Sequence, residues 1–514
     1  MDFVTTNIHM DTTRCKIESQ FTVEQDCNLA DSKPDVTNIL LSDGFVKLEE
    51  MRCSEGELLL RGKLLYKVLY ASEDDFGSLQ CMQGKIPFEE CIHVEDLCVT
   101  DSPQITLELE HLQVSAVNSR KLSLRGLLLV SGVICDIQDA CLSTGVEDNE
   151  QVEIHHKSCN VLNTAVMKKD ICRIREEVKL PSSMPEIGEL LWEQTELCNL
   201  EFRPEEDRLL IKGDISLLIL YTAREENRHV ECFETMLPFN TTIECNGSRE
   251  GLIPHITHAL TQKEFDILPD MDGVERILGL DLVCDLCIRL YEDMSVSLID
   301  DLYGIRNNIR PEFAPCNTKK LLALTCGKMR LEKEASLGHG EGILQILCCK
   351  AVLCPERCKP GNEGIEIEGY LGLQILYLTE DDRFPYRTQR TEIPFNYVID
   401  VPGMSSALLF ELETGLEHCQ ISASAGDEVS VKCIASFRVF AYEEQTLTTV
   451  CGTTPDTETD SNTSTSTITV YYVKEGDSLW NIGKDCLTPL NRIREENHLS
   501  SDHLVPGQKL IVMR

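Results

Sequence analysis

The chain has 514 residues, 42% of them hydrophobic, so it is long enough for roughly three to five domains and apolar enough to fold them. Its formal net charge of −38 argues against nucleic acid and anionic membranes as main partners, because like charges repel. The 25 cysteines are odd in number and too dilute for a disulfide scaffold, so we expect a reducing cytosol in which most of them are small buried side chains.

The first residues, MDFVTTNIHMDTTRCK, carry neither the basic start nor the apolar core of a secretory signal peptide. No apolar run in the chain reaches the ~18 residues that a transmembrane helix needs. The sequence therefore predicts a protein with no export signal and no transmembrane segment.

One pattern occurs three times along the chain. It contains a glycine, a tyrosine eight residues later, and a Pro-Phe pair whose proline follows the tyrosine by seventeen residues. The copies are Gly62, Tyr70 and Pro87-Phe88; Gly213, Tyr221 and Pro238-Phe239; and Gly369, Tyr377 and Pro394-Phe395. A further proline, Pro34, recurs as Pro185, whereas the third copy has Glu341 there. Markers at fixed spacing predict three homologous domains, at residues 10–150, 165–300 and 318–445.

The segments around these markers are expected to be strands. Residues 60–70 read LRGKLLYKVLY, and apolar side chains alternate along them, as they do along 211–221 and 367–377. Alternation with a period of two is typical of a half-buried strand. The marker glycine lies on the apolar face, where it leaves room for a crossing strand or a bulge.

An acidic stretch follows each tyrosine and is interpreted as a hairpin tip, after which a returning strand ends at Pro-Phe. The acidic stretches are Glu73–Asp75, Glu225-Glu226 and Glu380–Asp382. Late strands close the copies, and short helices are expected around Pro34–Leu40 and Pro185–Trp192. The predicted fold class is multidomain and mainly β, with three homologous β-sandwich-like repeats, then a flexible linker and a small βααβ domain.

Residues 446–468 are rich in Ser and Thr and contain no basic residue, so they are expected to form the linker. Residues 469–514 follow as a small module with six basic and six acidic side chains. Its expected order is a strand at 472–474, a helix from Leu479, a second helix around 490–497 and a strand at 510–512. Asp477 or Ser478 can cap the first helix.

This module resembles the LysM family. The residues that carry the resemblance are YxVKxGDSLxxI at 471–482, Asn-x-Leu at 497–499 and PGQxL at 506–510. The resemblance implies a shallow groove for N-acetylglucosamine polymers, lined by Gly476, Asp477, Ser478 and Leu479 with Trp480 beside them, facing Leu504, Val505 and Pro506. Trp480 is interpreted either as exposed binding surface or as a lid on the small core.

Three positions depart from the LysM pattern. Cys486 and Leu487 stand where the family usually has a tyrosine and a glycine, and Gly483 replaces a usual alanine. These residues support the first helix, so we expect the fold to be kept and the ligand to shift from glycan toward protein.

Three repeats followed by one LysM module resemble the SipL-type spore-coat proteins of sporulating clostridia, whose repeats are called SPOCS domains. The resemblance implies a scaffold protein of the mother-cell cytoplasm that is recruited to the forespore surface and the spore coat. It also implies that the LysM module binds a coat-basement protein such as the SpoIVA ATPase. The alternative is a cell-wall protein that binds peptidoglycan or N-acetylglucosamine, and self-association through the repeats is left open.

Several cysteines and histidines have a simple structural interpretation. Cys284 and Cys287 form a CxxC within an alternating strand, on opposite faces, which favours structural thiols over a metal or redox site. The same is expected for the cluster of Cys348, Cys349, Cys354 and Cys358, near which His339 is found. His155-His156 is expected to be exposed between domains.

No Ser-His-Asp set, paired carboxylates or nucleotide loop stands out, so we expect no catalytic residue, no cofactor and no metal. Gly338–Gly342 resembles a phosphate loop but lacks a following Lys-Ser/Thr, and the acidic tips match no calcium-loop spacing. Three copies of one unit suit multivalent binding, in which weak interfaces add through effective concentration. A hidden enzyme would require one copy to hold a cleft of polar residues that the other copies lack.

Overall fold

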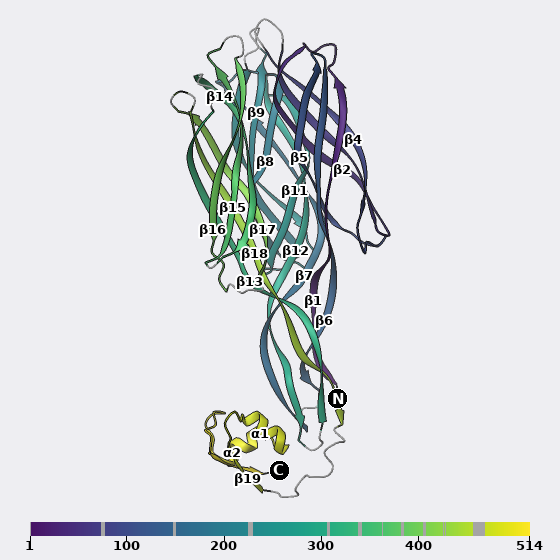
Figure 1. The fold of residues 1–514 in the computed structure, drawn as a ribbon, viewed down its shortest axis with the longest axis vertical. Coiled ribbons are helices and arrows are strands. Elements are labelled where there is room, and N and C mark those ends of the chain that lie inside the picture. Colours follow the sequence, from purple (N-terminus) through teal and green to yellow (C-terminus); the bar gives the residue numbers. More distant parts are fainter. Residues whose placement is uncertain are drawn as a thin grey trace.

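The computed structural model describes every residue except 1, 73–77, 148–150, 225–229, 306–308, 338–341, 362, 382–384, 404–407, 425, 427, 456–467 and 514. Three β-domains stand side by side and form a head, paired strands continue from it into a stalk, and a small helical module lies at the stalk tip (Figure 1). The predicted fold class is confirmed, because three similar units of sheet precede a small module with two short helices.

Each repeat is a sandwich of two three-stranded antiparallel sheets. In the first repeat the sheets have the orders β1 (Phe3–Asn28), β6 (Lys121–Val146), β5 (Gln104–Asn118) and β2 (Val36–Ser54), β3 (Glu57–Ser72), β4 (Leu79–His93). In the second they are β7 (Val152–Lys179), β12 (Glu275–Gly304), β11 (Ile253–Pro269) and β8 (Ile187–Glu205), β9 (Arg208–Ala223), β10 (Val230–Glu244). In the third they are β13 (Ile309–Ser336), β18 (Glu428–Pro455), β17 (Leu408–Ala423) and β14 (Ile343–Pro360), β15 (Ile365–Thr379), β16 (Tyr386–Ile399).

The repeated glycine and phenylalanine lie opposite each other on paired strands. The register pairs are Gly62–Phe88, Gly213–Phe239 and Gly369–Phe395. A Cβ added at Gly62 would lie 2.7 Å from the Phe88 ring and 2.4 Å from the backbone oxygen of Lys47, so the ring and the next strand fill the space that a side chain would take. The strand on the other side shifts register beside each glycine. Of the two alternatives expected at the glycine, a crossing strand or a bulge, the structure shows the bulge, on the strand paired to its other side.

Two predictions about these sheets are wrong. Strands β2 and β8 begin at Val36 and Ile187, in the segments where short helices were expected. The apolar residues there extend a sheet and pack against the neighbouring repeats, a tertiary contact that overrides local propensity. Strand β4 also continues past Phe88 to His93 instead of ending at the Pro-Phe pair.

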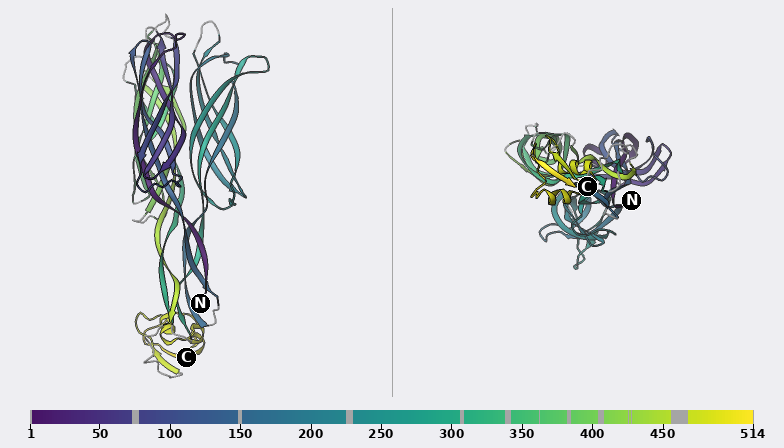
Figure 2. Two further views of the ribbon diagram at one scale, coloured as in Figure 1. Left: turned by 90° about the vertical axis from the view of Figure 1, so that its right-hand side faces the viewer. Right: turned by 90° about the horizontal axis from the view of Figure 1, so that it is seen from below.

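The stalk consists of three long two-stranded ribbons, β1–β6, β7–β12 and β13–β18, which wind around one another (Figures 1 and 2). Apolar side chains from all three ribbons fill its interior. They include Ile8, Met10, Leu142, Val161, Leu298 and Leu447. Strands β6 and β12 end at the stalk tip, beside the C-terminal module, and β7 and β13 begin there (Figure 1).

The stalk corrects the predicted domain boundaries. Residues 152–164, 301–304 and 309–317, which were placed outside the domains, belong to β7, β12 and β13. The predicted linker at 446–468 starts too early, because β18 continues to Pro455. In this stretch Leu447, Thr449 and Val450 are buried, while Thr446 and Thr448 are exposed, so the end of the ribbon can be rich in threonine and still pack in the stalk.

In the head, the three repeats meet in one apolar cluster around an approximate threefold axis, which Figure 2 shows from below. Equivalent residues of the three copies pack together there: Leu40-Leu41 with Leu69, Leu191-Trp192 with Leu220, and Leu347-Cys348 with Leu376. The repeats therefore form a single head with a shared core.

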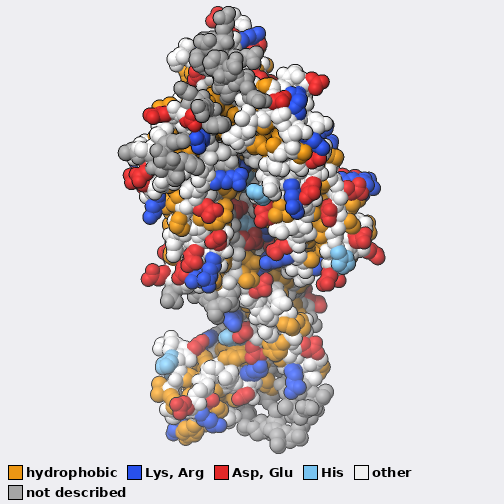
Figure 3. Space-filling model, turned by 45° about the horizontal axis from the view of Figure 1, so that its top comes forward, with side chains coloured by type: hydrophobic (Ala, Val, Ile, Leu, Met, Phe, Trp, Pro, Cys, Tyr) orange, Lys and Arg blue, Asp and Glu red, His pale blue; other side chains and the backbone are white. Residues whose placement is uncertain are grey.

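Acidic and basic side chains are interspersed over the face of the head in Figure 3. Glu73–Asp75, Glu225-Glu226, Asp382, His339 and Gly338 to Glu341 lie outside the described residues. Among the helices that the structure describes, none has the length and apolar character required to span a bilayer.

Candidate partner-binding site on the C-terminal module

The module has the predicted order of elements: β19 (Ile468–Tyr472), α1 (Leu479–Cys486), α2 (Leu490–Glu496) and β20 (Lys509–Met513). The first strand ends at Tyr472 instead of spanning residues 472–474. Ser478 is the N-cap of α1, and its Oγ accepts the N–H of Asn481 at 3.1 Å.

The two loops of the predicted groove hydrogen-bond to each other. The N–H of Gly507 donates to the backbone oxygen of Val473 at 2.7 Å, and the N–H of Val473 donates to that of Gln508 at 3.0 Å. These bonds hold the loop after β19 against the loop before β20. The two loops of the predicted groove are therefore held side by side.

Asp477 shapes the first of these loops. Its Oδ2 accepts the N–H of Lys474 at 2.8 Å and the hydroxyl of Tyr471 at 2.9 Å. The Lys474 N–H and the Tyr471 hydroxyl hold the pKa of the Asp477 carboxyl below its usual value. One carboxylate oxygen is thus committed to the fold of the loop.

The predicted groove residues divide into a surface and a floor. Gly476, Ser478, Val505 and Pro506 are exposed, with Val505 at 57%. Leu479 and Leu504 are 2% and 9% exposed and belong to the module core. A ligand can therefore contact the loop edges directly, while the two leucines support them from below.

Trp480 takes neither of the two positions considered from the sequence. Its Nε1 donates to Oδ2 of Asp301 at 2.8 Å, and its ring lies 5.0 Å from the rings of Tyr303 and His155. These three residues belong to the stalk. Lys484, one turn further along α1, pairs with the same Asp301 at 2.6 Å. Helix α1 therefore faces the stalk, and His155, which is exposed as predicted, lies beside it.

Gly483, one of the departures from the LysM pattern, lies at this contact. A Cβ added at Gly483 would lie 2.6 Å from the hydroxyl of Tyr303, which donates to the backbone oxygen of Thr488 at 2.8 Å. Leu487 ends α1 with a φ of 51°, the left-handed region that favours the glycine usual in the family. None of these positions lies in the two exposed loops. The departures therefore carry no physical argument against a glycan ligand.

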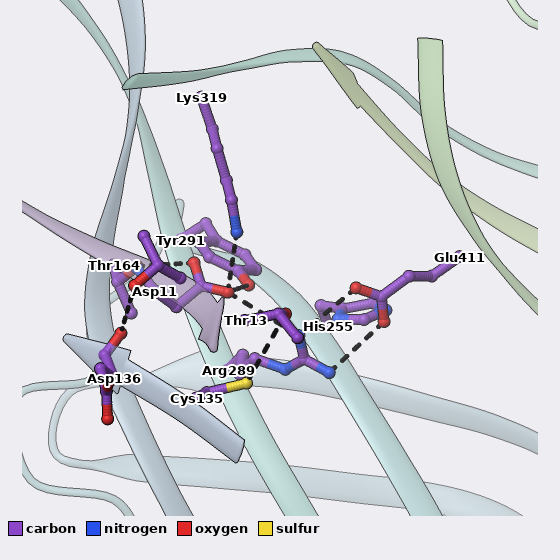
Figure 4. A network of polar contacts seen from close by, with 11 residues as sticks. Asp11, Thr13, Cys135, Asp136, Thr164, His255, Arg289, Tyr291, Lys319 and Glu411 are labelled. Carbon is purple, nitrogen blue, oxygen red and sulfur yellow. Dashed lines mark hydrogen bonds and ion pairs between the residues drawn. The ribbon is translucent and has the colours of Figure 1, made fainter. Parts of the chain in front are cut away.

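A second polar site joins the three repeats where the head meets the stalk, and Figure 4 shows it from close by. Its centre is Asp11 of the first repeat, which is 2% exposed. The carboxylate of Asp11 accepts hydrogen bonds at 3.1 Å from the hydroxyls of Thr164 and Tyr291 and from the ammonium group of Lys319. Strands of all three repeats thus meet on one carboxylate.

Arg289 extends this cluster toward the third repeat. Its guanidinium lies 3.8 Å from Asp11 and donates to both carboxylate oxygens of Glu411 at 3.4 Å. Buried charges that compensate one another in this way hold neighbouring strands in register. Two buried nitrogens of the cluster, Arg289 Nε and His255 Nδ1, make no hydrogen bond in the described part of the chain. We interpret the cluster as a clamp between repeats.

His255 closes the cluster on its apolar side. Its ring stacks on Phe440 at 4.6 Å, and its Nε2 lies 3.5 Å from Glu411. Burial lowers the pKa of His255 to about 4, although the nearby Glu411 opposes the shift. The histidine is therefore neutral in the folded protein at pH 7.

The shift predicts an acid-sensitive junction. In the unfolded chain His255 binds a proton below its ordinary pKa of 6.5, whereas in the folded chain it stays neutral down to about pH 4. The contribution of His255 to the free energy of unfolding is therefore fully present above pH 6.5 and decreases between pH 6.5 and about 4. Lowering the pH from 7 to 4 should remove about 3 kcal/mol at this residue. Thermal unfolding measured against pH should show a shallower acid slope in His255→Phe. Equal slopes in the wild type and His255→Phe would contradict the assignment.

The cysteines singled out in the sequence are distributed along strands. Cys284 is 2% exposed and pairs in register with Cys172, while Cys287 lies on the other face of β12, as predicted. Cys348 is buried in the head cluster, where burial raises the pKa of its thiol well above the usual value, and Cys349, Cys354 and Cys358 follow it along β14. Within the described ranges, no group of three or more His, Cys, Asp or Glu is placed to hold a metal ion.

A cleft of about 550 Å³ lies between the first two repeats. Two of its polar side chains have partners: Lys169 donates to the backbone oxygen of Pro103 at 2.6 Å, and Thr261 donates to Asp285 at 3.0 Å. Burial lowers the pKa of His258 on the same wall. These contacts do not form a nucleophile-and-base arrangement.

The stalk contact and the polar cluster were missed in the sequence because their members lie far apart along the chain. The period-two pattern gave no signal for the polar cluster. Asp11 lies between Met10 and Thr12, and Arg289 between Ile288 and Leu290, on the strand faces that alternation assigns to solvent. Only the packing of one repeat against another buries these faces, so the sequence does not show that the charges need partners.

Comparison with known families agrees with the architecture. The SipL, SPOCS domain family matches residues 35–117, 186–268 and 342–424, and the LysM domain family matches residues 471–512. A protein of Bacillus subtilis (strain 168), described as uncharacterized protein YkzQ, is 45% identical over 42 residues, which are 8% of this chain and 56% of that protein. No solved structure matches the chain.

Proposed function

Because the chain has the SipL-type architecture of three SPOCS domains followed by a LysM domain, we propose that it is a non-enzymatic adaptor in spore-coat assembly. It acts in the mother-cell cytoplasm and is recruited to the forespore surface. Its LysM groove binds a coat-basement protein such as the SpoIVA ATPase. The observation that carries the proposal is the pair of exposed loops, 476–478 and 505–506, presented at the stalk tip away from the head.

The distribution of charge supports a division of roles in which the module binds the partner and the head carries the module. The module carries equal numbers of basic and acidic side chains, so the excess negative charge belongs to the rest of the chain. The module at the far end of the stalk is the part of the chain that has no excess of negative charge, so it does not repel an acidic partner as the rest of the chain does. The head, with its shared core and paired polar groups, supports the module instead of performing chemistry.

The alternative is binding of peptidoglycan or another N-acetylglucosamine polymer. It is favoured by one observation: the two loops keep the Gly-Asp-Ser and Pro-Gly-Gln residues of the LysM pattern, and the departures lie outside these loops, in or directly after α1. An enzyme in the repeats has weaker support, because the carboxylate of Asp11 and the side chains of Lys169 and Thr261 in the cleft are already engaged by neighbouring groups.

A matched pair of substitutions tests the groove. Val505→Asp places a charge on the exposed loop and should weaken binding of the coat-basement protein at least tenfold, about 1.4 kcal/mol. Val470→Asp makes the same change at 54% exposure on the module's sheet and should leave binding unchanged. Binding is measured by calorimetry with the purified full chain, and peptidoglycan sacculi are tested in parallel.

Each outcome of this experiment has a distinct meaning. Retention of the partner by Val505→Asp would contradict the groove as its binding site. Binding to sacculi that Val505→Asp abolishes, without any protein partner, would replace the proposal by the glycan alternative. Leu504→Ala is unsuitable for this purpose, because Leu504 belongs to the module core and its loss should destabilise the module.

A further inference from the structure

We infer that the stalk end of the second repeat is a built binding site for the LysM module of the same chain. The site holds the module in one orientation. The inference concerns α1 and the residues that follow it, and not the exposed loops at 476–478 and 505–506, so it holds whichever ligand these loops bind.

The site consists of four side chains on one face of the β7–β12 ribbon, here called the docking face. Asp301 pairs in register with His155, and Tyr303 pairs with Glu153. Residues two apart on a strand, together with their cross-strand partners, point to the same side. All four contact the module, and the Glu153 carboxylate accepts the N–H of Leu490 at 3.2 Å.

A β-bulge turns these residues outward. The register of β12 against β7 shifts between Ile299 and Asp301. Ile299 and Leu302 are both 0% exposed in the stalk core, so the extra residue between them moves Asp301 and Tyr303 to the opposite face. Bulges are a known means of re-aiming side chains at functional positions.

The other two ribbons have a bulge at the equivalent position but lack the side chains of the docking face. Their registers shift between Val4 and Thr5 and between Glu312 and Phe313. The positions that correspond to Asp301 are then Gly145 and Gly452, which pair with Val4 and Glu312. Glycine has no side chain with which to contact the module. Of the three homologous ribbons, only that of the second repeat therefore has the docking face in the described part of the chain.

Burial indicates that the contact is more than a chance encounter. Tyr303 is 1% exposed although it lies one residue from the end of β12, and Thr488 is 0% exposed. The missing side chain at Gly483 leaves the space that the Tyr303 hydroxyl occupies. Asp301 accepts from both Trp480 and Lys484, and such a shared, charge-assisted pair adds orientation to affinity.

The tryptophans of the chain provide the test. The chain has two of them: Trp480 at the contact and Trp192, which is 3% exposed in the head. In the full chain, Asp301→Ala should release the module, shift Trp480 emission to the red and raise its quenching by acrylamide. Trp480→Phe provides the signal of Trp192 alone. Hydrogen exchange at the Leu490 amide should become faster in Asp301→Ala, because its acceptor Glu153 is withdrawn.

The matched control is Asp281→Ala, which removes an exposed ion pair with Arg175 at 2.9 Å further along the same strand and should leave both signals as in the wild type. Circular dichroism shows whether each variant keeps the folded head. If quenching and exchange in the wild type already equal those of Asp301→Ala, the module is not held at the stalk and the inference is overturned. Loss of partner binding by Val505→Asp would be unaffected by that result, so the two proposals fail separately.

Discussion

Asp11→Ala is expected to destabilise the head and stalk by about 3–5 kcal/mol, because it leaves two buried cations without their shared carboxylate. Lys319 and Arg289 have side chains that are 13% and 7% exposed, so water cannot replace the lost partner. Tyr291 also loses the acceptor of its hydroxyl. The measurement is the midpoint of urea unfolding of the full chain, followed by circular dichroism.

The control for this change lies on the same ribbon. Asp139 pairs with His9 at 2.6 Å, but its side chain is 67% exposed, so Asp139→Ala should shift the free energy of unfolding by less than about 1 kcal/mol. Asp11→Asn keeps the shape and removes the charge, and it should lie between the two. If Asp11→Ala and Asp139→Ala unfold at the same urea concentration, the cluster is not a clamp.

Trp192→Ala is expected to cost about 3–5 kcal/mol, the usual range for truncating a buried tryptophan. Trp192 is 3% exposed and fills the cluster where the three repeats meet. Its loss creates a cavity shared by three sheets, so we expect the repeats to unfold less cooperatively as well as earlier. Differential scanning calorimetry should show a lower and broader transition.

A leucine of β14 provides the comparison. Leu344 is 61% exposed and lies on the same strand as Leu347 of the cluster, so Leu344→Ala should leave the transition within about 0.5 kcal/mol of the wild type. A sharp transition in Trp192→Ala at the wild-type temperature would show that the repeats hold together without this cluster.

The sequence was most informative at positions where the local backbone or packing accepts only one type of residue. The glycine that recurs as Gly62, Gly213 and Gly369 predicted a close approach, and its phenylalanine partner proved to lie directly across the strand pair. The elements of the module could also be predicted, because backbone geometry determines which residues occur at its turns and at the helix N-cap. Ser478 caps α1, and the loops of Gly476 and Gly507 lie where they were expected.

The candidate site was only partly predictable. The exposed loops of the groove could be named from the pattern, but the burial of Leu504 and the position of Trp480 could not. An aromatic residue on a short helix has the same local signature whether it faces solvent, its own core or another domain. Asp301 and Tyr303, which decide the position of Trp480, lie about 180 residues earlier in the chain.

The sequence by itself determined that the chain has three copies of one β-rich unit and a LysM module, because fixed spacings and period-two alternation are local properties of the chain. The tertiary structure decided what the copies do together. The first and last strands of each repeat pair and form the stalk. The repeats contact one another through Asp11 and Trp192, and the second repeat provides the docking face for the module. Such contacts depend on which distant strands meet. Burying a polar or charged side chain is favourable only when its partner is in place, and the sequence does not show which partner that is.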